Sequence, residues 1–378
     1  CQWACIDQRR NRPIINNHDS KYDICVIVLY LRLILFAVIF HVTKCIEWDC
    51  ASSTTTSIFT RSTDCTITGS NHVAVTNTLE INGTNTDMNH LVTITAANTK
   101  RHFYLNNANA KLTLRYLKLV GGDVSSYSSN PDQLGGSILI YTNGGELNLY
   151  SSIVFNNKAY EGGGILAYGA SNTNKNAIMN IYNSIIHNNE ATYGGGGIVM
   201  VYALGTIYNT TIDNNQGGGS NVGGGGMVIM ESDLTMKNTI ISNNDAGSGG
   251  GLEIGGESTT VTLRQSSFIN NDATNNGDEI YTYESPTISL INTYFNNPNN
   301  NNNIVESGTP TWKTCLNTLC TENPFNGTCS AVDNTNIKYG SNISSKSFFY
   351  DVSKKYSNQT FEDIFMPQLK FIDKASIL

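Results

Sequence analysis

Three residues that carry acid, base or nucleophile chemistry occupy the same position in successive copies of a repeated segment. They are His187, Asp213 and Ser242, and Phe155 precedes them in the same column. A nucleophilic triad needs the histidine in the middle, where it takes the serine proton while the aspartate holds its far nitrogen. Here Asp213 is in the middle, so we expect no catalytic residue. We interpret the column as a solvated ladder with a contact between His187 and Asp213.

Acidic residues suited to polysaccharide cleavage form the second group. Enzymes that cleave polysaccharides need clustered carboxylates on one face, for calcium or for acid-base work, together with a positioned arginine or lysine. No two candidates form a pair between neighbouring copies within the columns of the gap-free segments, so we expect them to be scattered over corners, with no metal site and no cofactor. The candidates are Asp213, Asp245, Asp272, Asp278, Glu253 and Glu161.

An aromatic column continued by two cations is the third candidate, and its parity is opposite to that of the apolar positions. Such an outward strip is suited to stacking on sugar rings or to docking a protein partner. The alternative is an ordinary sheet surface, where tyrosine satisfies strand propensity. The predicted binding residues are Tyr150, Tyr182, Tyr208, Lys237 and Arg264.

One recurring segment positions all three groups. Its copies start 35, 32, 26, 29, 27 and 27 residues apart, and a glycine-rich motif follows most of them. The copies lie at 112–122, 147–157, 179–189, 205–215, 234–244 and 261–271, with a shorter one at 288–297. The glycine motifs lie at 135–138, 162–165, 195–198, 224–227 and 249–252.

Apolar residues alternate with period two inside each copy, which is typical of strands with one face turned inward. A unit of about 27 residues without a helical pattern cannot bury its apolar face alone, so successive units must stack. The sequence therefore predicts an all-β fold, a right-handed single-stranded parallel β-helix. The inward positions include Leu147, Leu149, Ile181, Ile207, Met236 and Leu263.

An asparagine pair closes most copies. Asparagine tolerates the left-handed conformation of a sharp corner, and its amide can bond the same residue one coil away. We expect a structural ladder formed by Asn157, Asn189, Asn215, Asn244, Asn271 and Asn297.

Composition divides the chain into a leader at 1–45, the β-helix at 46–305 and a cysteine-containing segment of unassigned fold at 306–378. The apolar run at 24–40 resembles a signal peptide or a signal anchor, so a membrane anchor is left open. Disulfides are expected at the flanks, with free thiols as the alternative. Together these features predict an extracellular protein, secreted or on the cell surface. The flanking cysteines considered for disulfides are Cys50, Cys65, Cys315, Cys320 and Cys329.

Charge excludes one class of partner. The formal net charge is −7 and no cluster of lysine and arginine exists to neutralise phosphates, so we expect no nucleic-acid partner.

Two short motifs carry a family resemblance. Phe268 to Asn271 reads Phe-Ile-Asn-Asn, other copies place another apolar residue before the asparagine, and Gly-Gly-Gly-Ile recurs between them. The region 112–297 resembles the repeats of the polymorphic membrane proteins, chlamydial outer-membrane adhesins whose units combine a Gly-Gly-Ala-Ile-like motif with Phe-x-x-Asn. The resemblance implies a cell-surface, pectin-lyase-like β-helix with an adhesive role.

We therefore expect a non-enzymatic protein that presents an elongated binding surface, in adhesion or in a structural role, to a glycan or a cell-surface protein. The alternative is a polysaccharide lyase or glycoside hydrolase of the pectin-lyase-like superfamily, because fold does not fix function. The Asn-Thr-Asp, Asp-Asp, Gly-His-Gly and Arg-Ile-Lys patterns that resemblance to polygalacturonases would require are absent.

Overall fold

The computed structural model describes a series of strands joined by turns. No helix in this described part is long and apolar enough to cross a membrane. The predicted leader with its apolar run at 24–40, the ladder residue Asn297 and Cys329 lie outside the described residues. The described residues are 46–51, 57–67, 72–97, 99–218, 223–291, 293–296, 304–316, 319–320 and 338–339.

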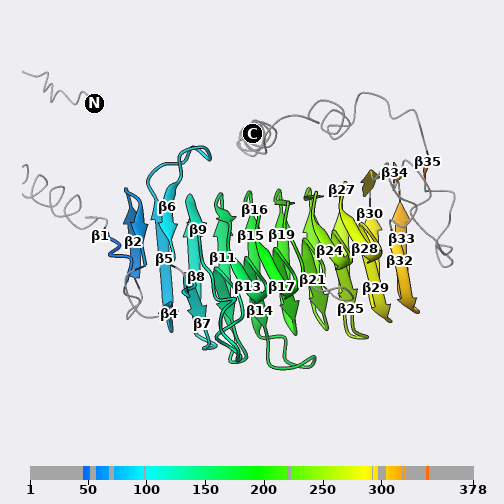
Figure 1. The fold of residues 1–378 in the computed structure, drawn as a ribbon, viewed down its shortest axis with the longest axis horizontal. Helices are drawn as coiled ribbons and strands as arrows, with labels where there is room; N and C mark the ends of the chain where they lie inside the picture. The colour runs from blue at the N-terminus through cyan, green and yellow to red at the C-terminus, as the bar shows by residue number, and fades with distance from the viewer. Residues whose placement is uncertain are drawn as a thin grey trace, which may run out of the picture. The chain divides into compact units, whose positions relative to one another are not determined.

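Among the described residues, parallel strands stack into three long sheets along a solenoid (Figure 1), with 11 strands in sheet A, 11 in sheet B and 9 in sheet C. Sheet A contains β1 (Ile46–Glu47), β2 (Ser57–Arg61), β5 (Thr78–Gly83), β8 (Lys111–Arg115), β11 (Gly145–Tyr150), β15 (Ala177–Tyr182), β19 (Ala203–Tyr208), β22 (Asp233–Lys237), β26 (Thr260–Arg264), β30 (Thr287–Ile291) and β33 (Thr311–Leu316). Sheet B contains β3 (Cys65–Thr66), β6 (Val92–Thr95), β9 (Leu117–Val120), β12 (Ile153–Phe155), β16 (Ile185–His187), β20 (Thr211–Asp213), β23 (Ile240–Ser242), β27 (Ser267–Ile269), β31 (Tyr294–Asn296), β34 (Leu319–Cys320) and β35 (Lys338–Tyr339).

Sheet C and a short sheet D complete each coil. Sheet C contains β4 (Val73–Val75), β7 (Phe103–Leu105), β10 (Ile138–Ile140), β14 (Ile165–Tyr168), β18 (Ile198–Val201), β21 (Met227–Met230), β25 (Leu252–Gly255), β29 (Ile280–Glu284) and β32 (Ile304–Gly308). Sheet D consists of two pairs, β13 (Lys158–Glu161) with β17 (Glu190–Gly194) and β24 (Asp245–Ser248) with β28 (Asp272–Asn276), which are bridged through Gln216.

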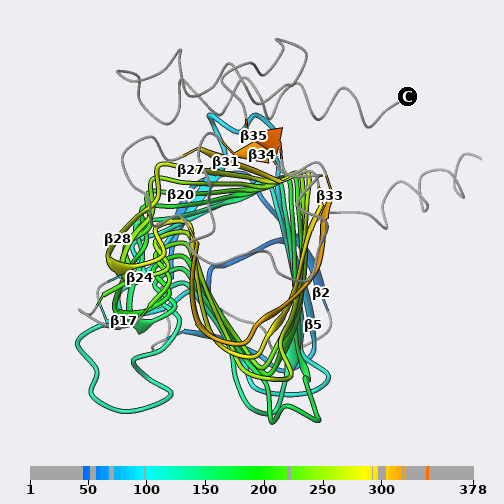
Figure 2. The ribbon, with the colours of Figure 1, turned by 90° about the vertical axis from the view of Figure 1, so that its right-hand side faces the viewer.

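The prediction of stacked parallel coils is confirmed. A coil passes from sheet A through B and D to C. The view down the axis shows sheets A, B and C around one interior, with sheet D beside them (Figure 2). The six apolar residues expected to point inward are each exposed by 1% or less. Burying one such aliphatic side chain contributes about 1.5–3 kcal/mol, so the stack of coils is held mainly by this continuous core.

The two asparagines of each corner pair divide two tasks between them. The first residue of each pair adopts the left-handed conformation, with φ of 54° at Asn188 and 51° at Asn214. The second forms the ladder: Asn189 Nδ2 donates to Asn215 Oδ1 at 3.0 Å, and Asn215 Nδ2 to the next asparagine at 3.0 Å. The structure shows this ladder from Asn157 through Asn271, with every member exposed by 1% or less.

A second ladder of hydroxyls lies at the other end of sheet B and was not predicted. The Ser184 hydroxyl donates to the Tyr182 carbonyl at 2.7 Å and accepts the Ser152 backbone N–H at 3.2 Å. With both ends of each sheet B strand tied to neighbouring coils, the outward columns of sheets A and B stay in register. The ladder members are Ser152, Ser184, Thr210, Thr239 and Ser266.

The ends of the described coils bear on two predictions from composition. A disulfide joins Cys50 to Cys65 at the start of the solenoid. Strand pairing runs through the expected boundary at residue 305, because β32 pairs with β29 and β33 pairs with β30. Cys315 and Cys320 lie on the backbones of β33 and β34.

Candidate functional sites on the outer surface

The sheet A strip is the outward column predicted from tyrosine spacing, and the structure extends it by one coil. Tyr150 pairs with Arg115 on one side and Tyr182 on the other, and the column continues through the partners of Tyr182. All members are partly exposed except Arg264, which is exposed. The sheet A strip is Arg115, Tyr150, Tyr182, Tyr208, Lys237 and Arg264.

Neighbouring side chains of the strip stack on the faces of its tyrosine rings. Tyr150 and Tyr182 stack with centroids 5.1 Å apart and planes 9° apart. The Arg115 guanidinium lies 3.9 Å from the Tyr150 centroid and approaches from the coil on the other side. Both faces of Tyr150 are therefore covered, so this ring presents its edge outward and cannot form the flat sugar platform expected from sequence.

The cations at the other end of the strip are less constrained. Lys237 Nζ lies 5.5 Å over the Tyr208 ring, and Arg264 is its register partner one coil away. In the part of the chain that the structure describes, neither has a carboxylate within ion-pair distance. Like charges on neighbouring strands repel, so this placement costs some stability in the free protein.

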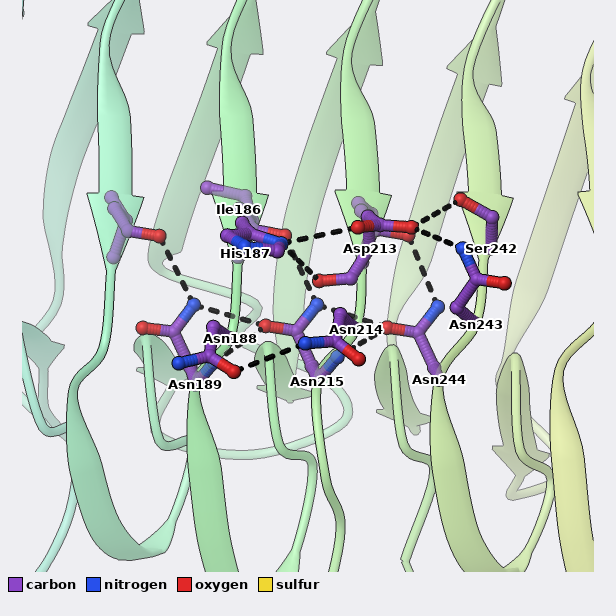
Figure 3. A network of polar contacts seen from close by, with 12 residues as sticks. Ile186, His187, Asn188, Asn189, Asp213, Asn214, Asn215, Ser242, Asn243 and Asn244 are labelled. Carbon is purple, nitrogen blue, oxygen red and sulfur yellow. Dashed lines mark hydrogen bonds and ion pairs between the residues drawn. The ribbon is translucent and has the colours of Figure 1, made fainter. Parts of the chain in front are cut away.

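The His187, Asp213 and Ser242 column forms a connected polar network (Figure 3). Asp213 is 3% exposed, and its Oδ1 accepts the Ser242 hydroxyl at 2.7 Å and the Asn243 amide at 2.8 Å. The predicted contact with His187 is present, with Nδ1 3.1 Å from Asp213 Oδ2. The expectation that this column is solvated is wrong, because Asp213 and Ser242 are both buried. The imidazole stacks on Phe155 at 5.4 Å.

This arrangement is unsuited to nucleophilic catalysis. The Ser242 hydroxyl is spent on Asp213, is 2% exposed, and contacts no imidazole that could take its proton. The carboxylate instead joins three coils, because His187, Asp213 and Ser242 belong to β16, β20 and β23. The network therefore acts as a structural clamp beside the asparagine ladder.

One expectation about the acidic residues is wrong. Asp245 and Asp272 do form an adjacent-coil pair, as register partners in β24 and β28. Partial desolvation of the carboxyl, followed by the charge of Asp272, raises the pKa of Asp245. The sequence columns ended at the second asparagine, one residue before this pair, and so missed it. No group of three or more histidine, cysteine or acidic residues in the described ranges could hold a metal ion.

A groove on the outer face of sheet C was not predicted at all. We call it the sheet C groove; its volume is about 620 Å³. Two of the acidic candidates, Glu161 and Glu253, line it, but its aromatic residues come from β14, β17, the turn after β18, and β29, so no single column carries them. The tyrosines are Tyr168, Tyr193, Tyr202, Tyr281 and Tyr283.

The comparisons with known proteins support the fold and stop there. A family model described as the right handed beta helix region matches residues 173–296, about a third of the chain. No curated protein and no solved structure matches. The fold is therefore a right-handed parallel β-helix. Its function has to be argued from the surfaces described above, chiefly the sheet A strip and the sheet C groove.

Proposed function

We propose that the protein acts outside the cell as a non-enzymatic right-handed β-helix that binds an extended, negatively charged glycan along the sheet A strip. The observation that carries the proposal is the alignment of six side chains in register over consecutive strands of sheet A. A linear polymer laid along the solenoid would meet one of these side chains about every 4.8 Å.

The charges of the strip favour an anionic chain. Lys237 and Arg264 repel each other in the free protein, and an anion placed between them would remove that cost. The protein as a whole carries a formal charge of −7, so the cationic end of the strip is a local feature against an acidic background. Each of the three tyrosines of the strip, Tyr182 among them, offers one hydroxyl, and such hydroxyls are suited to hydrogen bonding with a polar chain.

An extracellular location is supported by two independent features. The Cys50–Cys65 disulfide fits an oxidising compartment. The repeat motifs resemble those of the chlamydial polymorphic membrane proteins, and that resemblance supports an adhesive role.

The decisive experiment reverses the strip's charge. In Lys237→Glu/Arg264→Glu, affinity for a heparin hexasaccharide or a hexagalacturonate should fall at least tenfold, about 1.4 kcal/mol, and the salt dependence of binding should weaken. Lys118→Glu makes the same type of change on sheet B and should leave affinity near that of the wild type. Equal binding by the double variant and the wild type would refute the strip as a glycan site.

The partner class and the role of the rings need a separate measurement. Tyr182→Phe retains the stack on Tyr150 and removes only the hydroxyl, so a loss of affinity would assign hydrogen bonding to the ring edge. Capture of a cell-surface protein, with no response to either charged hexasaccharide, would replace the glycan with a protein partner.

A second candidate, glycoside hydrolysis, is favoured by the Asp245–Asp272 pair alone. Retaining glycosidases place two carboxyl groups about 5 Å apart, close to one strand spacing, and keep one of them protonated. The raised pKa of Asp245 fits that pattern, but both residues are exposed on sheet D. Polysaccharide-cleaving activity that vanishes in Asp245→Asn and survives in the strip variants would promote this candidate.

A further inference from the structure

The sheet C groove exists because two outward columns lose bulk in the middle of the stack. One column runs from Tyr168 through Val201, Met230 and Gly255 to Tyr283. This column has a tyrosine at each end of the groove and smaller side chains between them. The second column runs from Val199 through Val228 and Glu253 to Tyr281, so it has a tyrosine at one end only. The result is a hollow with an apolar floor and aromatic ends, which extends over β14, β18, β21, β25 and β29, or about 19 Å along the axis.

The ends of the groove are shaped by specific ring contacts. The ring of Tyr283 occupies the space above Gly255, where a Cβ would lie 2.0 Å from its Cζ. At the opposite end Tyr168 and Tyr202 meet edge to face, with centroids 5.9 Å apart. Along the side, Tyr193 stacks on Tyr160 and is 43% exposed.

The charges that line the groove differ from those of the strip. The described lining contains no lysine or arginine, and its only ionisable groups besides the tyrosines are Glu161 and Glu253. Burial raises the pKa of Glu161 and brings that of Glu253 to about 7. Glu253 is 6% exposed, and its Oε2 accepts the Gly223 backbone N–H at 2.6 Å. The described lining therefore has no group that would attract an anion.

We propose that the sheet C groove is a second binding site, which takes an uncharged oligosaccharide of several sugar units. Tyrosine rings pack against the apolar faces of sugar rings, while their hydroxyls and the carboxyl of Glu253 supply donors and acceptors for sugar hydroxyls. The volume of about 620 Å³ lies within the range of small-molecule sites, and the length along the axis suits a chain rather than a single sugar. A uronic acid polymer is excluded, because no cation in the lining offsets its carboxylates.

The groove is suited to holding such a chain rather than cleaving it. Glu161 and Glu253 are the only carboxylates in the described lining, and they come from coils three apart, about 14 Å along the axis. That separation exceeds the roughly 5–9.5 Å that glycoside hydrolysis requires.

Calorimetry on the full chain with three neutral hexasaccharides tests the site: cellohexaose, laminarihexaose and the hexamer of N-acetylglucosamine, with hexagalacturonate as the charged comparison. At least one neutral hexamer should bind through the groove. Its affinity should fall at least tenfold in Tyr281→Ala, which removes a ring at one end. Val201→Trp fills the floor without removing a contact and should lower affinity by at least as much.

The strip variants separate this site from the proposed function. Lys237→Glu/Arg264→Glu should leave binding of the neutral hexamer unchanged, and Tyr281→Ala should leave binding of the charged hexamer unchanged. The second site is overturned if no neutral hexamer binds at millimolar concentration. It is also overturned if binding persists in both groove variants while circular dichroism and melting show them to be folded, whatever the outcome at the strip.

Discussion

The sheet A strip and the sheet C groove both contain tyrosines on the same stack of coils, but the tyrosines are arranged differently on the two faces. In the strip, tyrosines share one column, so register alone brings Tyr150 and Tyr182 face to face at 5.1 Å. In the groove, tyrosines come from different strands and turns and surround smaller side chains. Tyrosines at register positions on neighbouring strands therefore stack on one another. Tyrosines that come from different strands and turns keep part of their ring surface accessible to a ligand.

The two surfaces also differ in charge. The strip ends in adjacent cations, Lys237 and Arg264, while the described lining of the groove contains only carboxylates as charged groups apart from tyrosine. Glu253 is buried enough that its pKa is about 7. We propose on this basis that the two faces bind different classes of glycan, and each prediction below tests whether the faces act independently.

The largest effect is expected from a change in the asparagine ladder, because the ladder holds the coils that carry both surfaces. Asn215→Leu removes the Oδ1 that accepts two N–H donors of Asn189, and it removes the Nδ2 that donates to Asn244 Oδ1 and to the Ile186 carbonyl. Only the backbone N–H at position 215 can still donate to Asn244 Oδ1. We expect a loss of about 3–5 kcal/mol in the free energy of unfolding, measured in urea, with both binding activities lost together. Asn214→Gly is the matched control, since glycine accepts φ of 51° at this exposed neighbour. Equal costs for the two changes would contradict the ladder's role.

The frame and the strip were within reach of sequence reasoning because both are periodic. Inward parity at Leu147 and Ile181 follows from alternation, and a column such as Tyr150 and Tyr182 follows from copies aligned without gaps. The Ser184 ladder was equally periodic, but it lies among hydroxyl residues that also suit exposed strands and turns, so burial had to be seen.

The groove and the acidic pair depend on distances that unequal loops determine. Tyr193 and Tyr202 reach the groove from different parts of one coil, and Tyr281 from three coils further on. Their spacing along the chain does not predict that they line the same groove. A usable signal was the replacement of large outward residues by Val201 and Gly255 between tyrosines of the same column.

The next effect distinguishes the groove by its response to pH. The pKa of Glu253 is about 7 in the folded protein against 4.5 when exposed, so ionisation destabilises the fold. The contribution of the protonated Glu253 carboxyl to the free energy of unfolding is fully present below pH 4.5. It is lost as pH rises through 7, and the loss is at most about 3 kcal/mol. Wild type should lose more stability than Glu253→Gln between pH 4.5 and 8, in urea melts at each pH. Parallel curves would mean that this carboxyl is solvated.

A smaller effect is expected from steric change at the end of the groove. Gly255→Val puts a side chain where the Tyr283 ring lies and should cost about 1–3 kcal/mol while reducing neutral hexamer binding. Charged hexamer binding at the strip should persist. In a Tyr283→Ala background the same change should cost less, because the ring is gone; an unchanged cost would show that some other contact is responsible.

The smallest effect compares how rings couple on the two faces. A double-mutant cycle to alanine at Tyr150 and Tyr182 should give a coupling of about 0.5–1.5 kcal/mol in the free protein, because these rings stack directly. The same cycle at Tyr202 and Tyr281 should give almost none, because three strand spacings, about 14 Å, separate their coils. Repeating the second cycle with saturating neutral hexamer should produce a coupling, since one chain would then touch both rings. A groove pair already coupled without ligand, or still uncoupled with it, would contradict the division between rings that serve the fold and rings that serve a ligand.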